Sequence, residues 1–125
     1  MERIATVKKT SEILHDFSFS MKKSFGQNFL VVPRVPEYIA NNIGIDEETL
    51  VIEIGPGVGA LTDFLLDKAK KVICYEIDKD LIPILNNLLI ETRLAKKKGA
   101  RMEARLIDYY RAITGLNFVR KGRDK

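Results

Sequence analysis

Residues 50–60 read Leu-Val-Ile-Glu-Ile-Gly-Pro-Gly-Val-Gly-Ala, and this stretch decides the fold of the chain. Its first half is an apolar, β-branched run that is typical of a buried strand. Three glycines spaced two apart follow directly, and helix-forming residues come next. The stretch therefore predicts a strand, a tight glycine turn and the start of a helix, which is the ligand-binding corner of a Rossmann-like βαβ unit.

The three glycines of this turn have different expected tasks. Gly55 permits the tight turn, Gly57 lets a ligand lie against bare backbone, and Gly59 lets a helix pack closely. A small molecule held at this corner is therefore the main functional hypothesis.

The composition is that of a soluble globular domain. The chain has 125 residues, of which 46% are apolar and 30% are charged. No apolar run approaches the ~20 residues that span a bilayer, and the polar, charged start does not resemble a signal peptide, so we expect a cytoplasmic location. One cysteine and one histidine leave no disulfide framework and no metal cluster to predict.

The positive charge is concentrated near the C-terminus. Residues 1–90 carry 10 Lys and Arg against 13 Asp and Glu, whereas residues 91–125 carry 11 against 4. A basic stretch of this kind is either an electrostatic handle for nucleic acid or a solvated helix face, and the sequence leaves both open.

Hydrophobic periodicity predicts an α/β fold around the glycine turn. It is a truncated Rossmann-like core over residues 1–90, followed by a basic, mostly helical tail over 91–125. The expected strands are 50–54, 71–77 and a short one at 116–119. The expected helices are 10–16, 32–42, 62–70, one capped by Asp80, and one over 91–115 that has Met102 and Leu106 at helical spacing.

Residues 18–30 have neither a helical nor a strand period. They place three phenylalanines among Lys22, Lys23, Gln27 and Asn28. Either the aromatic rings anchor this segment on the core, or it is a cationic, aromatic lip over a binding site, suited to stacking on bases and pairing with phosphates.

Two carboxylates indicate which ligand the turn holds. Glu76 ends the second predicted strand about 20 residues after Gly55, where an acid reaches both hydroxyls of a ribose. NAD and S-adenosylmethionine fit this spacing equally. However, Glu53 beside the turn would repel a pyrophosphate and tolerate a cationic methionyl group, and Pro56 lacks the N–H that a phosphate would use. Both features favour S-adenosylmethionine, with an NAD-dependent dehydrogenase as the alternative enzyme.

Three motifs in order resemble one enzyme family, the small-subunit ribosomal RNA adenine dimethyltransferases. They are Phe-Ser-Met-Lys-Lys-Ser-Phe-Gly-Gln-Asn-Phe-Leu-Val (19–31), Val-Ile-Glu-Ile-Gly-Pro-Gly-Val-Gly-Ala-Leu-Thr (51–62) and Lys-Val-Ile-Cys-Tyr-Glu-Ile-Asp-Lys-Asp-Leu-Ile-Pro-Ile-Leu (71–85). The resemblance covers about residues 4–90. The related erythromycin-resistance methyltransferases share the Gln-Asn-Phe and the glycine turn.

The resemblance implies a cofactor, a partner and site residues. The cofactor would be S-adenosylmethionine, and the reaction would be dimethylation of two adjacent adenines in the RNA of the small ribosomal subunit. By position, Asn28 and Leu30 would border the methionyl part, Gly55 would contact the cofactor through its backbone, Gly57 would lie beside it, and Glu76 would bind the ribose.

Residues 91–125 do not resemble the family at all. Family members continue to a strand that ends in Asn-Leu/Ile-Pro-Tyr/Phe, which grips the target amine, and no proline follows Pro83 here. We therefore expect weak or no methyl transfer by this chain, with a non-catalytic RNA-binding or structural fragment as the alternative. The far edge of the first strand is expected to be open, which would permit self-association.

Overall fold

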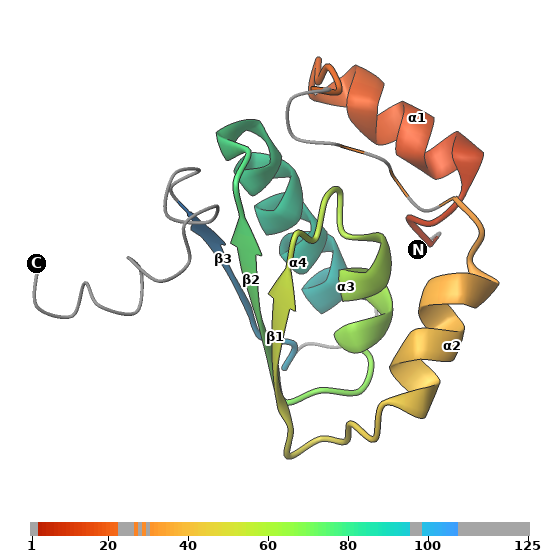
Figure 1. The fold of residues 1–125 in the computed structure, drawn as a ribbon, viewed down its shortest axis with the longest axis vertical. Coiled ribbons are helices and arrows are strands. Elements are labelled where there is room, and N and C mark those ends of the chain that lie inside the picture. The colour runs from red at the N-terminus through yellow and green to blue at the C-terminus, as the bar shows by residue number, and fades with distance from the viewer. Residues whose placement is uncertain (1–2, 23–26, 28, 30, 96–98, 108–125) are drawn as a thin grey trace, which may run out of the picture.

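Three parallel strands form the sheet that carries the glycine turn. The computed structural model describes residues 3–22, 27, 29, 31–95 and 99–107. The strands are β1 (Leu50–Ile54), β2 (Lys71–Glu76) and β3 (Met102–Leu106), and their order in the sheet is β1-β2-β3. The register pairs Leu50 with Lys71 and Val72 with Met102, so the carboxyl ends of the strands meet at one edge of the sheet (Figure 1).

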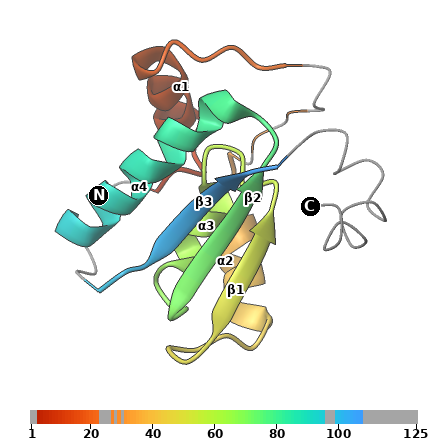
Figure 2. The same cartoon turned by 90° about the vertical axis from the view of Figure 1, so that its left-hand side faces the viewer.

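Helices cover one face of this sheet. They are α1 (Val7–Asp16), α2 (Arg34–Asn42), α3 (Ala60–Leu65) and α4 (Ile82–Ala95), and a short 3-10 helix, η2 (Lys79–Leu81), leads into α4. Figure 2 shows the strands in front with α2 and α3 behind them. No helix in the described part of the chain is long and apolar enough to span a membrane.

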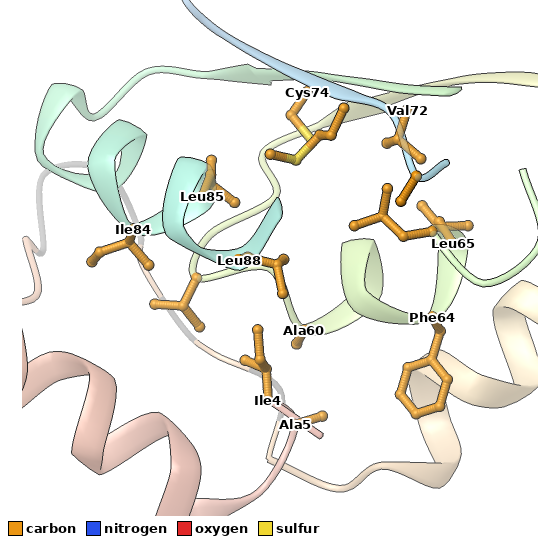
Figure 3. Close-up of a cluster of buried hydrophobic side chains, with 14 of the residues drawn as sticks. Ile4, Ala5, Ala60, Phe64, Leu65, Val72, Cys74, Ile84, Leu85 and Leu88 are labelled. Carbon is orange, nitrogen blue, oxygen red and sulfur yellow. The ribbon is translucent and has the colours of Figure 1, made fainter. Parts of the chain in front are cut away.

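The hydrophobic core lies between the sheet and α3 and α4 (Figure 3). Val72 and Cys74 of β2 point into it and are fully buried, as are Leu65 of α3 and Leu85 of α4. Full burial of such an aliphatic side chain contributes roughly 1.5–3 kcal/mol. The core therefore holds β1, β2 and the intervening turn in a fixed arrangement.

Most predicted elements are present, with shifted ends. Both strands around the glycine turn are confirmed. The first helix begins earlier than predicted, at Val7, because the Thr6 side chain caps it by accepting a hydrogen bond from the Lys9 N–H. The helix after the turn is shorter than predicted and ends at Leu65. The last turn before α4 is capped by Asp78, which accepts from the N–H of Asp80, the residue predicted as the cap.

The helix predicted over 91–115 is wrong for Met102–Leu106, which form β3. The sequence Met-Glu-Ala-Arg-Leu alternates apolar and charged residues, so it also fits the period of a strand. Pairing with β2 satisfies its backbone groups and buries Met102. The sheet thus continues past the boundary predicted at residue 90. The predicted strand 116–119 and the end of the predicted helix lie outside the described residues.

The first strand has an open edge and an open face within the described residues. β1 pairs with β2 alone, and its outward side chains Leu50, Ile52 and Ile54 are 55, 58 and 70% exposed. The same face also has polar groups on the other two strands. There Lys71 Nζ lies 3.2 Å from Glu103 Oε1, and Arg105 Nη1 donates to the Tyr75 hydroxyl at 2.8 Å. Ile73 of β2 pairs with Ile52 on this face, so the apolar part covers β1 and the centre of β2.

Candidate cofactor site

A cavity of about 380 Å³ lies at the carboxyl ends of β1 and β2. Ligands of open α/β sheets bind at this end of the strands, and the volume is within the range of small-molecule sites. The wall comes from the segment before α2, the end of β1, the glycine turn, and the residues that follow β2: Gln27, Phe29, Glu53, Ile54, Gly55, Pro56, Gly57, Val58, Glu76, Ile77 and Leu81 among others.

Two glycines of the turn meet close neighbours. At Gly59, where φ is +97°, an added Cβ would lie 2.6 Å from Leu88 Cδ2 of α4. At Gly57 it would lie 3.2 Å from the Phe29 ring, so this ring covers the backbone that was expected to face a ligand. Among the described residues, no atom beyond the chain neighbours of Gly55 lies within 4 Å of the corresponding position, and Gly55 lines the cavity.

The three glycine N–H groups all donate hydrogen bonds inside the protein. The pairs are Gly55 N to Tyr75 O at 2.9 Å, Gly57 N to Glu76 Oε1 at 3.2 Å, and Gly59 N to Pro56 O at 3.0 Å. Phosphate-binding turns instead point their N–H groups at the ligand. The glycine donors of this turn are therefore not available to a pyrophosphate.

Glu76 is held in one orientation at the wall of the cavity. Its side chain is buried, Oε1 accepts from Gly57 N, and Oε2 accepts from Asp78 N at 2.9 Å. Each carboxylate oxygen can accept a further hydrogen bond. Both oxygens are thereby fixed at the wall of the cavity, and the binding of a ribose by Glu76 stays a prediction.

Glu53 is a second buried carboxyl group of the same wall. Thr62 Oγ1 donates to its Oε1 at 2.5 Å, and the Cys74 Sγ lies 3.7 Å from the same oxygen. Burial raises the pKa of Glu53, the contacts with Thr62 and Cys74 partly oppose this rise, and the nearby charge of Glu76 adds to it. Burial likewise raises the pKa of Cys74.

Glu53→Gln is expected to stabilise the ligand-free protein at neutral and higher pH. A carboxyl group whose pKa is raised by folding keeps its proton longer than in the unfolded chain, so stability falls as pH rises above the ordinary glutamate value of about 4.3. The amide is never charged and still accepts from Thr62. We expect a gain of about 1 kcal/mol in the free energy of unfolding at pH 8, and none at pH 4. Urea unfolding at both pH values tests this, and an equal effect at both would contradict it.

The aromatic segment both anchors on the core and borders the cavity. Phe19 and Phe29 pack against the core with their ring centroids 6.2 Å apart, and Lys22 Nζ lies 4.4 Å from the centre of the Phe19 ring. Phe29 and Gln27 also line the cavity. The described part of this segment therefore anchors on the core and borders the cavity, and its binding of bases or phosphates stays a prediction. Asn28 and Leu30, predicted beside the methionyl group, lie outside the described residues.

Asp78 is a polar residue of this region that the sequence reasoning missed. It is 2% exposed and receives hydrogen bonds from Lys22 and Gln27, more than 50 residues earlier in the chain. An available signal was its position, two residues after Glu76 and just before a helix, where a buried aspartate often serves as a cap.

Fold and site together define a Rossmann-like methyltransferase domain. The sheet is parallel, and the cavity at its carboxyl edge contains two carboxylates and no glycine donor for a phosphate. The model of the ribosomal RNA adenine dimethylase family matches residues 18–118, so the chain belongs to that family. The predicted lack of resemblance beyond residue 90 is therefore wrong as far as residue 118. The family and its methyltransferase neighbours use S-adenosylmethionine.

Individual relatives agree with this assignment. The chain is 52% identical over 86 residues to ribosomal RNA small subunit methyltransferase A of Bacillus licheniformis, a match that covers 69% of this chain and 30% of that protein. A dimethyladenosine transferase from Plasmodium falciparum matches with a TM-score of 0.53 and 30% identity, over 62% of this chain and 26% of that one. A putative RNA methyltransferase from Pyrococcus horikoshii matches with a TM-score of 0.54 and 25% identity, over 80 and 51% of the two chains. The chain thus spans about 30% of the length of the curated relatives it matches.

Proposed function

We propose that the cavity binds S-adenosylmethionine and that the protein serves the dimethylation of adenines in the RNA of the small ribosomal subunit. The observation that carries the choice of ligand is the donor pattern of the cavity. Two carboxylates line it, and each glycine N–H of the turn is already used within the protein. Such a site disfavours a pyrophosphate and suits a ligand with ribose hydroxyls and a positive charge. The RNA substrate, and with it the cytoplasmic location, rests on family membership.

The residues of the site have distinct proposed tasks. Glu76 accepts hydrogen bonds from the ribose hydroxyls, the Gly55 backbone contacts the cofactor, and Glu53 lies toward its positively charged methionyl part. Asn28 and Leu30 border that part, by resemblance to the family. When bound, S-adenosylmethionine supplies an electrophilic methyl group on a sulfonium centre.

Orientation is the main contribution expected from the protein. The exocyclic amine of adenine is a weak nucleophile, so the base must be extruded and held in line with the methyl group. The family motif that grips this amine is absent from these 125 residues. We therefore expect this chain to bind the cofactor and to transfer the methyl group weakly or not at all.

Calorimetric titration tests the choice of ligand. We expect saturable binding of S-adenosylmethionine and no heat of binding with NAD⁺ at the same concentrations. S-adenosylhomocysteine, which lacks the positive sulfonium charge, reports how much Glu53 contributes through charge. Saturable binding of NAD⁺ would contradict the proposal, and so would a lack of binding of both S-adenosylmethionine and S-adenosylhomocysteine.

We also propose that a second copy of the chain pairs with the open edge of β1. Within the described residues this edge has no neighbouring strand, and the outward side chains of β1 form an apolar strip that Ile73 of β2 extends. Exposed edges of this kind promote association between chains. Sedimentation velocity should show a dimer that forms with increasing concentration and that Ile52→Lys abolishes. A wild-type monomer at every concentration up to about 100 µM would contradict self-association.

A further inference from the structure

A buried aspartate joins the aromatic segment to the end of β2. Asp78 Oδ2 accepts from Lys22 Nζ at 2.9 Å and from Gln27 Nε2 at 2.7 Å, and Oδ1 accepts from Asp80 N at 3.0 Å. The side chain is 2% exposed. A carboxylate buried to this degree is stable only when such partners compensate for the water it has lost.

The same residue is connected to the proposed ribose ligand. The N–H of Asp78 donates to Glu76 Oε2, so the backbone at Asp78 helps to orient the Glu76 carboxylate. The side chain and the backbone of one residue thus contact two different walls of the cavity.

The side chain of Asp78 contacts the wall of the cavity that contains Gln27 and Phe29. Lys22 N donates to Gln27 Oε1 at 2.7 Å, so the Gln27 amide is held from both ends, by Lys22 and by Asp78. Both Gln27 and Phe29 line the cavity, and the Phe29 ring lies against Gly57. The hydrogen bonds of Gln27 therefore fasten the segment two residues before the ring.

We propose that Asp78 is a positioning residue of the cofactor site, whose carboxylate holds Gln27 and thereby the Phe29 wall while its N–H orients Glu76. The proposal rests on the proposed binding of S-adenosylmethionine. Asp78 itself does not line the cavity and need not touch the ligand.

The charges around Asp78 are compatible with this task. Burial alone would raise the pKa of Asp78, but the hydrogen bonds from Lys22, from the Asp80 backbone and from Gln27 outweigh burial and lower it. The facing groups are Lys22, whose pKa is raised mainly by its hydrogen bond to Asp78, and Asp80, which lies 3.0 Å from Lys22 Nζ. The carboxylate is therefore ionised at neutral pH.

An exchange of polarity tests the proposal. Asp78→Asn keeps one acceptor oxygen, so its side chain cannot accept from both Gln27 Nε2 and the Asp80 N–H, and its NH₂ group opposes one of these donors. Gln27→Glu places a carboxylate oxygen against Asp78 Oδ2. Each single variant thus brings two like groups together and should lower the affinity for S-adenosylmethionine about tenfold. The double variant restores a donor-acceptor pair and keeps the negative charge near Lys22, so its affinity should return to within about threefold of wild type.

Asp80→Asn is the matched control. It removes a carboxylate that also contacts Lys22 but that is half exposed and, within the described contacts, binds neither Gln27 nor Glu76 through its side chain. Its affinity should stay within about twofold of wild type. Loss of affinity in Asp80→Asn equal to that in Asp78→Asn would overturn the proposal, because the charge near Lys22 would then be the cause.

A measurement without ligand separates this proposal from the proposed function. In the wild-type chain, NMR should show a nuclear Overhauser effect between the Phe29 ring and the Gly57 Hα, lost in either single variant and recovered in the double. If this pattern appears but neither the wild type nor any variant binds S-adenosylmethionine, the proposed function fails and the positioning of Phe29 stands. An unchanged Phe29–Gly57 contact in Asp78→Asn, or no recovery in the double variant, would overturn the positioning role even if the melting temperatures fall.

Discussion

Glu76→Ala is expected to lower the affinity for S-adenosylmethionine by about 100-fold or more. The substitution removes both oxygens that would receive the ribose hydroxyls, and a hydrogen bond to a charged acceptor in a sheltered site contributes about 1.5–3 kcal/mol. It also leaves Gly57 N and Asp78 N without their acceptor. Isothermal titration of the variant and the wild type measures the difference directly.

Two further variants make this result specific to the site. Glu103→Gln removes a carboxylate from β3 on the opposite face of the sheet and should leave the affinity unchanged. Glu76→Gln keeps one oxygen and the shape of the side chain, so its loss should be intermediate. Equal affinities of wild type and Glu76→Ala, in chains that unfold at similar temperatures, would show that the ribose does not bind at Glu76.

Local sequence was sufficient where an element is defined by its own residues. The strand at 50–54, the glycine turn and the helix after it lie in one continuous stretch, residues 50–65, and the structure places the turn, Glu53 and Glu76 around one cavity. The spacing between Gly55 and Glu76 predicted that they lie close together, because consecutive parallel strands align their carboxyl ends.

Features that depend on a distant partner could not be predicted in the same way. Met102–Leu106 fits both a helical and a strand period, and its state is decided by the free edge of β2, which local periodicity does not include. The hydrogen bonds of Asp78 cross more than 50 residues of chain. Phe29 was expected in a segment near the site, but its contact with Gly57 follows from how that segment packs. Sequence therefore located the cofactor corner, and tertiary packing determined its walls.

Gly59→Ala is expected to lower the free energy of unfolding by about 2–4 kcal/mol. The positive φ of +97° costs an alanine about 1–2 kcal/mol, and the added methyl group would lie 2.6 Å from Leu88 Cδ2 in the core between the turn and α4. Leu88 is 3% exposed, so it can move aside only by displacing its own neighbours. A loss of this size is a large part of the 5–15 kcal/mol that stabilises a typical domain.

Gly44→Ala separates the two causes of that loss. Gly44 has a similar positive φ, +75°, but in the part of the chain that the structure describes no atom beyond its chain neighbours lies within 4 Å of its Cβ position, so the substitution adds backbone strain without a clash. Urea unfolding should therefore show a loss of about 1 kcal/mol for Gly44→Ala and a clearly larger one for Gly59→Ala. If the two losses are equal, α4 accommodates the methyl group, and the close approach of Leu88 to the turn is not what requires glycine at position 59. A larger loss at Gly59 means that the glycine turn is coupled to α4 through direct packing, because the helix then resists a displacement of even one methyl group.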